Sequence, residues 1–123
     1  KNGVTTHDRT TTGTQNIAHG LGTTPKKIRI NVSYGNTGVS GNGRSQGVYN
    51  GTATSMIYQY NIGSSATTST RSGQSSTNII EIKDLDGITS SYATVTFDGT
   101  NIILSWSNTG SPTGTCDIMW EAE

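Results

Sequence analysis

The sequence is poor in charged residues, in hydrophobic residues and in cysteine. Of its 123 residues, 13% are charged and 29% are hydrophobic, and Cys116 is the single cysteine. One cysteine excludes an intrachain disulfide, and its position in phase with Ile118 and Trp120 predicts a buried small side chain rather than a nucleophile. No run of about 18 apolar residues is present, which excludes a predicted transmembrane helix.

Net charge is absent as well. Eight basic residues balance eight acidic ones. Nucleic acids and anionic membrane surfaces recruit basic proteins, so neither is expected as a partner, and we expect no membrane insertion. Disordered chains combine low hydrophobicity with an excess of one charge, which is not the pattern here. A chain near zero net charge associates easily, which is consistent with a homo-oligomer.

What fills the sequence instead is Ser, Thr, Asn and 16 Gly, with the apolar residues in alternating runs. The clearest runs lie in 92–123, where a turn at Asp98-Gly99 and a longer one at 108–114 separate three of them. Alternation with a period of two predicts an antiparallel meander with one buried face. Trp106 and Trp120 are in phase with the core positions, so packing is their expected role. The sequence therefore predicts an all-β fold, an antiparallel and jelly-roll-like β-sandwich.

The other expected strands cover 15–21, 28–34, 56–62 and 79–83. The run at 56–62 is apolar on both faces, which favours a central strand or a contact with a neighbouring subunit. Residues 1–14 lack periodicity and are interpreted as an extended lead-in or connector, which leaves 15–123 as a single β-sandwich domain. Two stretches punctuated by glycine, 35–51 and 63–78, are expected to be long polar loops, the first with room for a short hairpin near Val48 and Tyr49.

These two expected loops are the best candidates for ligand binding, because recognition is concentrated in loops carried by a rigid scaffold. Sugars are recognised by aromatic faces together with planar amide, carboxylate or guanidinium groups. The alternative is that both loops are only solvated. The candidate ligand-binding residues are Tyr34, Asn36, Asn42, Arg44, Gln46, Tyr49 and Asn50 in and beside the first loop, and Arg71 and Gln74 in the second.

Motifs for catalysis or metal binding are weak. There is no Gly-x-Ser-x-Gly elbow, phosphate loop or zinc spacing, and the acidic residues fall mainly at turns rather than as a glycosidase pair. We therefore expect no enzyme, no catalytic residue, no metal and no cofactor. Asp84-Leu85-Asp86-Gly87 is similar to the start of a calcium loop, but the later ligands are missing, which favours a plain turn. His19 has no second ligand at suitable spacing and is interpreted as a structural residue that fixes the turn before Pro25.

Two segments carry a resemblance to a known family. Residues 13–28 read GTQNIAHGLGTTPKKI, and residues 105–122 read SWSNTGSPTGTCDIMWEA. Together they resemble bacteriophage tail-fibre and related virion receptor-binding tip domains. The resemblance implies a trimeric β-sandwich at the tip of a fibre, on the virion and outside the cell, that adheres to a host-surface polysaccharide or protein.

Three functions remain open from the sequence. The first is a non-enzymatic attachment module that binds a host-surface glycan or protein. The second is a structural tip or trimerisation domain that brings the chains of a fibre into register and binds no ligand. The third is a carbohydrate-binding accessory domain of a depolymerase.

Overall fold

The structure is a computed structural model that describes residues 1–35, 42–64 and 67–123, with no helix among them. None of the described residues therefore forms a helix long and apolar enough to cross a membrane. The ten strands are β1 (Asn2–Asp8), β2 (Gly13–Ala18), β3 (Ile28–Gly35), β4 (Asn42–Tyr49), β5 (Thr54–Ser64), β6 (Thr67–Ser75), β7 (Ile80–Lys83), β8 (Ser90–Phe97), β9 (Asn101–Thr109) and β10 (Thr115–Ala122).

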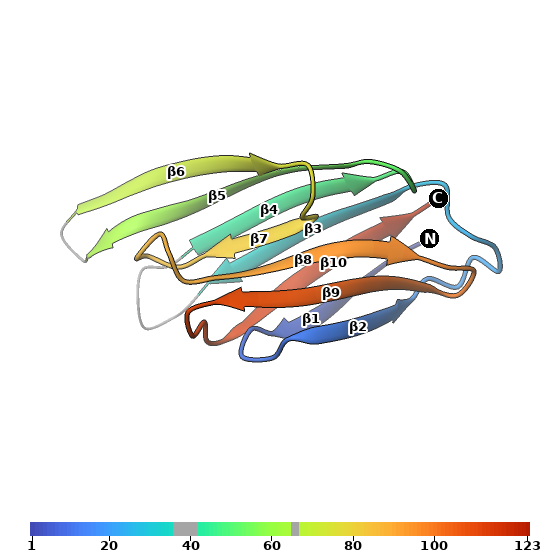
Figure 1. Ribbon diagram of the computed structural model, residues 1–123, viewed down its shortest axis with the longest axis horizontal. Helices are drawn as coiled ribbons and strands as arrows, with labels where there is room; N and C mark the ends of the chain where they lie inside the picture. The colour runs from blue at the N-terminus through green and yellow to red at the C-terminus, as the bar shows by residue number, and fades with distance from the viewer. Residues whose placement is uncertain (36–41, 65–66) are drawn as a thin grey trace.

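The strands form two antiparallel sheets that pack face to face (Figure 1). The larger sheet has six strands in the order β1-β10-β3-β4-β5-β6, and the smaller has four in the order β2-β9-β8-β7. The prediction of an all-β antiparallel sandwich is confirmed.

The core lies between the sheets and follows the alternation seen in the sequence. On β3 the side chains of Ile28, Ile30 and Val32 are buried, and every second residue of β8, β9 and β10 is buried in the same way. Trp106 and Trp120 are 3% and 7% exposed, so their predicted packing role is confirmed. Cys116 is fully buried, and this burial raises the pKa of its thiol to about 11, so the thiolate that a nucleophile requires is scarce at neutral pH.

The three runs of 92–123 do not form one meander, which corrects that prediction. β8 pairs with β9, but β10 lies in the other sheet between β1 and β3. The segment 110–114 carries the chain from one sheet to the other. Alternation reports that a strand has one buried face, and both sheets of a sandwich have such a face, so the pattern could not assign the pairing.

The interpretation of residues 1–14 as a connector is also wrong. β1 is the edge strand of the larger sheet and pairs with β10 along its whole length, from Asn2 opposite Glu121 to Asp8 opposite Thr115. β2 begins at Gly13 and is the edge strand of the smaller sheet, paired with β9. The two edges are joined by a tight turn in which Asp8 Oδ1 accepts a hydrogen bond from the Thr10 amide over 2.9 Å. The first strand was missed because its inward positions are mostly polar or small.

Much of each expected loop is strand, which corrects the prediction for 35–51 and 63–78. β4 buries Gly43, Ser45 and Gly47 and exposes the residues between them. These small residues are required because β7 packs directly on β4: a Cβ at Gly47 would collide with the Ile79 carbonyl oxygen. The alternation on β4 is therefore one of small against large side chains, which a search for apolar residues does not detect.

The β5–β6 hairpin extends past the edge of the smaller sheet. β7 is the last strand of that sheet and packs against β3, β4 and β5, whereas β6 lies outside it at the top of the view in Figure 1. The inner face of this hairpin, which is the side that faces the smaller sheet, is therefore only partly covered.

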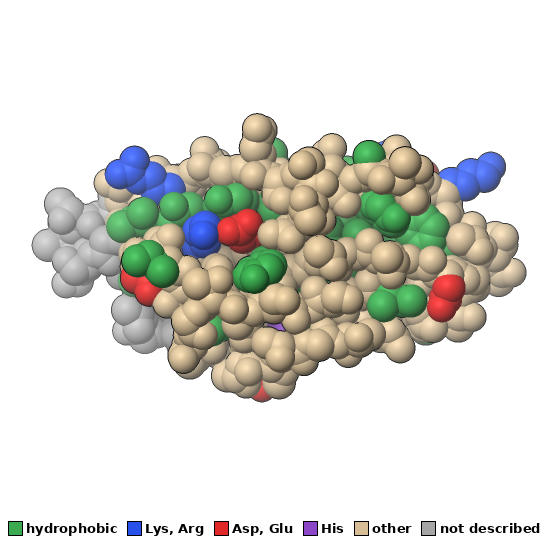
Figure 2. All heavy atoms as spheres, viewed as in Figure 1, with side chains coloured by type: hydrophobic (Ala, Val, Ile, Leu, Met, Phe, Trp, Pro, Cys, Tyr) green, Lys and Arg blue, Asp and Glu red, His purple; other side chains and the backbone are tan. Residues whose placement is uncertain are grey.

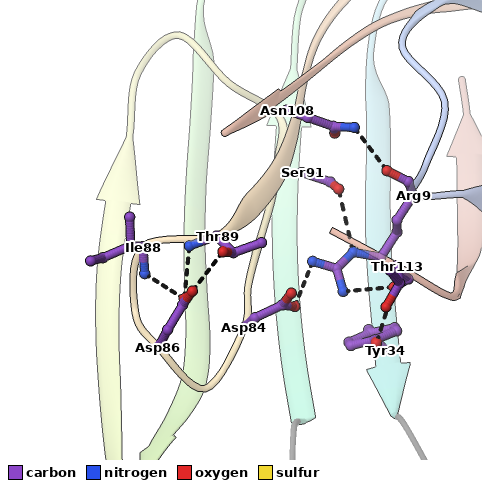
Figure 3. Close-up of polar contacts among 9 residues, drawn as sticks. All are labelled: Arg9, Tyr34, Asp84, Asp86, Ile88, Thr89, Ser91, Asn108 and Thr113. Carbon is purple, nitrogen blue, oxygen red and sulfur yellow. Dashed lines mark hydrogen bonds and ion pairs between the residues drawn. The ribbon is translucent and has the colours of Figure 1, made fainter. Parts of the chain in front are cut away.

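A buried arginine ties together one end of the sandwich (Figure 3). Arg9, in the β1–β2 turn, is fully buried, and its Nη2 lies 2.7 Å from the Asp84 Oδ1 atom of the β7–β8 turn. Its guanidinium also donates to Ser91 Oγ and to the Thr113 carbonyl oxygen, each over 3.3 Å, and lies 4.1 Å from the centre of the Tyr34 ring. A buried charge is tolerated only when it is paired and hydrogen-bonded, as it is here. We call this group of five residues the Arg9 cluster.

Candidate functional site

The face of the larger sheet that points away from the core, here called the outer face, is not covered by any described part of the chain. The strand register aligns one residue from each of the six strands in a row across it. This row, here called the outer row, runs Val4, Met119, Asn31, Gln46, Ile57 and Gln74. The outer row therefore places two apolar side chains at one end, two amides in the middle, and an apolar side chain next to an amide at the other end.

Two shallow grooves run along this face and share Asn31, Gln46 and Ile57. The first has a volume of about 730 Å³ and lies over β3 to β6, and the second, of about 470 Å³, lies over β1, β10 and β3 to β5. The first is also lined by Arg29, Val48, Ser55, Gln74 and Ser75, and the second by Val4, Ser33, Arg44, Gln59, Asp117 and Met119. Amides, hydroxyls and guanidinium groups along an open groove suit a polar ligand that makes many hydrogen bonds.

The structure brings together only some of the candidate residues named from the sequence. Arg44 and Gln46 on β4 and Gln74 on β6 are exposed on the outer face, and Asn42 begins β4. Arg71 is exposed on β6 but opposes Tyr60, which places it on the inner side of the hairpin.

The remaining candidates lie elsewhere. Tyr34 is 7% exposed and belongs to the core, where its hydroxyl donates to the Thr113 carbonyl oxygen. Tyr49 packs edge-on against Phe97 with ring centres 5.3 Å apart, and the Asn50 side chain accepts hydrogen bonds from the Thr52 and Ala53 amides to close a turn. Asn36 lies outside the described residues.

Sequence reasoning missed a second surface, on the inner side of the β5–β6 hairpin. It consists of Tyr58 and Tyr60 on β5 with Glu81 and Lys83 on β7, and we call it the tyrosine shelf. The two rings are nearly parallel, with centres 5.9 Å apart and planes inclined by 25°. Both tyrosines are half-buried. The alternation of Met56, Tyr58, Tyr60 and Ile62 carried the signal, but it was interpreted as a central strand or a contact with a neighbouring subunit.

The charges on the tyrosine shelf are paired. Lys83 Nζ lies 3.1 Å from Glu81 Oε1, and both side chains are largely shielded from solvent. Partial burial works to lower the pKa of Lys83, but the hydrogen bond to Glu81 and its negative charge outweigh burial and raise that pKa above its ordinary value. Burial, together with the charge of Glu81, also raises the pKa of the Tyr58 hydroxyl. At neutral pH the shelf therefore presents an ammonium group and a hydroxyl that both retain their protons.

The residues considered for metal binding make structural contacts. His19 is 2% exposed; its Nδ1 accepts from the Leu21 amide and its Nε2 lies 3.1 Å from the Asp98 carbonyl oxygen, which confirms the predicted structural role. Asp86 accepts hydrogen bonds from the Thr89 hydroxyl and from the Ile88 and Thr89 amides, which lower its pKa and close the β7–β8 turn in Figure 3. Asp84 pairs with Arg9. No group of three potential metal ligands occurs among the described residues.

Comparison of the chain with protein-family models, with curated proteins and with solved structures finds no match in any of the three. Its functional assignment therefore depends on the geometry described above and on the sequence resemblance.

Proposed function

We propose that this domain is a non-enzymatic attachment module of a virion, the receptor-binding tip of a tail fibre or a similar protein, that binds a host-surface polysaccharide or protein. The observation that carries this proposal is the open outer face, where Arg44, Gln46 and Gln74 line grooves with amide, hydroxyl and guanidinium groups. Such groups match the paired hydroxyls of a glycan. The resemblance of residues 13–28 and of the closing strand to fibre-tip domains supports the same function.

Binding of the fluorescently labelled chain to host cells and to a glycan array tests this proposal. We expect Gln46→Ala and Arg44→Ala to weaken binding, because both side chains line the grooves. Thr94→Ala is the matched control, since Thr94 is exposed on the smaller sheet and far from the outer face. An array and a cell assay without any bound ligand would contradict the proposal, and so would equal losses for all three variants.

A second function, a structural tip that holds a fibre together through contacts between copies, is favoured by one observation. Val4, Ile57 and Met119 are 74%, 60% and 53% exposed, and all three belong to the outer row. Apolar side chains that share one open face mark a protein contact more often than a sugar site. A solution mass of three times 12.9 kDa, combined with an empty glycan array, would favour this function over attachment.

A further inference from the structure

We propose that the tyrosine shelf is a sugar-binding subsite that takes the flat apolar face of a neutral hexose unit in a glycan. The inference rests on the proposed function, because it assumes a glycan ligand. It goes further by naming the type of sugar contact and by placing that contact on the inner side of the β5–β6 hairpin, away from the outer-face grooves.

The first step is the way in which the Tyr58 ring is held. A Cβ at Gly73, the residue opposite Tyr58 on β6, would collide with the ring and with its hydroxyl. The ring therefore lies against a glycine that leaves space for it. Its position is set before a ligand arrives, which lowers the entropic cost of binding.

The second step is the chemistry of the platform. The face of an aromatic ring carries partial negative charge, which attracts the weakly positive C–H hydrogens on the flat side of a pyranose. Tyr60 follows Tyr58 on the same side of β5, with its ring centre 5.9 Å from that of Tyr58.

The third step is the polar edge of the platform. Glu81 supplies acceptors and Lys83 supplies donors, and Lys83 Nζ lies 6.0 Å from the centre of the Tyr58 ring. A sugar hydroxyl both donates and accepts, so a carboxylate and an ammonium group side by side can bind two neighbouring hydroxyls. Because Glu81 and Lys83 neutralise one another, this edge suits a neutral sugar. Arg71, opposite Tyr60 on β6, carries a further positive charge on the same side of the hairpin, and the glucuronide in the test below measures whether that charge attracts an anionic sugar.

The shelf is reached from the side of the smaller sheet and is braced at one end. Figure 2, seen from the side of the smaller sheet, shows hydrophobic side chains exposed over β5 next to a basic and an acidic group. The β7–β8 turn braces the far end, where a Cβ at Gly87 would meet the Ile62 side chain at 3.0 Å, and the Arg9–Asp84 ion pair anchors this turn. Because the shelf and the outer face lie on opposite sides of β5, contacts between copies on the outer face would leave the shelf open.

The test is a titration of the ¹⁵N-labelled full chain with methyl β-galactopyranoside and methyl β-glucopyranoside, followed by NMR. A parallel titration with methyl glucuronide measures the binding of a negatively charged sugar. We expect shift changes centred on Tyr58, Tyr60, Gly73 and Lys83. Tyr58→Phe keeps the ring and should keep binding, whereas Tyr58→Leu and Tyr60→Leu should each raise the dissociation constant by at least about tenfold. Thr14→Ala is the control and should bind as the unaltered chain does, because Thr14 is exposed on β2, at the opposite edge of the smaller sheet from β7, and lines neither groove.

The outcomes separate this inference from the proposed function. Shift changes on the outer face alone, stronger binding of the glucuronide than of both neutral glycosides, or no shift change with any glycoside up to about 50 mM would overturn the shelf as a neutral-sugar site. If the chain still adheres to host cells in these cases, the attachment function stands and only its assigned subsite is lost. Should Tyr58→Leu fail to fold, the titration of the unaltered chain, read at its tyrosine ring signals, decides the matter by itself.

Discussion

At the scale of single residues, Arg9 is the most consequential side chain in the fold. It is fully buried and joins three turns, so its charge depends on Asp84 for compensation. We predict that Asp84→Asn lowers the free energy of unfolding by roughly 3–5 kcal/mol, because it leaves the buried guanidinium without a negatively charged partner. Urea unfolding followed by tryptophan fluorescence measures the change.

The chain offers a matched control for that prediction. Arg29 and Glu121 also form an ion pair, at 3.3 Å, but both side chains are about half exposed. Solvent screens such a pair, so Glu121→Gln should cost under about 1 kcal/mol. A further comparison uses Arg9→Met combined with Asp84→Asn, which should be less destabilised than the sum of the two single variants because no unpaired charge remains. Additive losses would show that the ion pair itself contributes little.

His7 makes the stability of the fold depend on pH. Its ring lies flat on Trp106, with ring centres 3.7 Å apart, and burial lowers its pKa below the ordinary value of 6.5. The unfolded chain therefore binds a proton at a higher pH than the folded chain does. Stability is fully present above pH 6.5 and is predicted to fall as the pH drops below that value.

The measurement is the free energy of unfolding between pH 7.5 and about 5, compared with that of His7→Phe. Phenylalanine keeps a ring on Trp106 but cannot take up a proton, so the loss of stability in this interval should be smaller in the variant. Asp8, Asp86 and Asp98 also have lowered pKa values, caused mainly by hydrogen bonds from neighbouring Thr and Asn residues. These carboxylates change the free energy of unfolding only at lower pH than the interval measured here. Parallel curves for the two proteins would contradict the assignment to His7.

At the scale of strands, close approach between the two sheets decides where glycine is required. Gly47 of β4 faces the Ile79 carbonyl oxygen so closely that no side chain fits. We predict that Gly47→Ala lowers the free energy of unfolding by about 1–3 kcal/mol through overpacking. Gly99→Ala is the control, because a Cβ there would meet only Thr24 Oγ1 at 4.0 Å. Thermal unfolding should separate the two variants, and equal midpoints would mean that β7 can shift away from β4.

Strands with large inward residues could be predicted from the sequence, and strands with small or polar ones could not. β3, β8, β9 and β10 alternate Ile, Val, Leu or Trp with polar residues, and their existence follows from that period. β4 uses Gly and Ser where it faces β7, and β6 is almost wholly Ser, Thr and Gly. Their polar composition is that of loops, although their register with β5 is continuous.

The candidate site was predictable only in part for the same reason. Arg44, Gln46 and Gln74 were predicted as candidate ligand-binding side chains, but in loops rather than on strands, so their alignment with Asn31 and Ile57 across the sheet could not be anticipated. The proximity of Tyr58 to Glu81 and Lys83 depends on how far β7 reaches under the β5–β6 hairpin. That is a property of the packing of two sheets and leaves no local trace in the sequence.

At the scale of the whole molecule, the two faces of the β5–β6 hairpin predict two separable properties. The outer row exposes Ile57 and Met119, which are suited to contacts between copies, and the inner side carries the tyrosine shelf. A chain with zero net charge has no overall repulsion to oppose such contacts. We therefore predict that Met119→Glu lowers the average mass measured by light scattering at high protein concentration, since it places a charge where an apolar contact is expected.

The same variant should leave the glycoside-induced shift changes at Tyr58 and Tyr60 unchanged, because β10 does not take part in the tyrosine shelf. Tyr60→Leu should show the reverse pattern, with an unaltered mass and weakened sugar binding. Asp117→Asn is the control for a charge change on β10. Asp117 lies in the row next to Met119, and this substitution removes a charge instead of adding one. If Met119→Glu and Tyr60→Leu changed both properties together, assembly and ligand binding would share one surface, and the division of function between the two faces of this hairpin would be wrong.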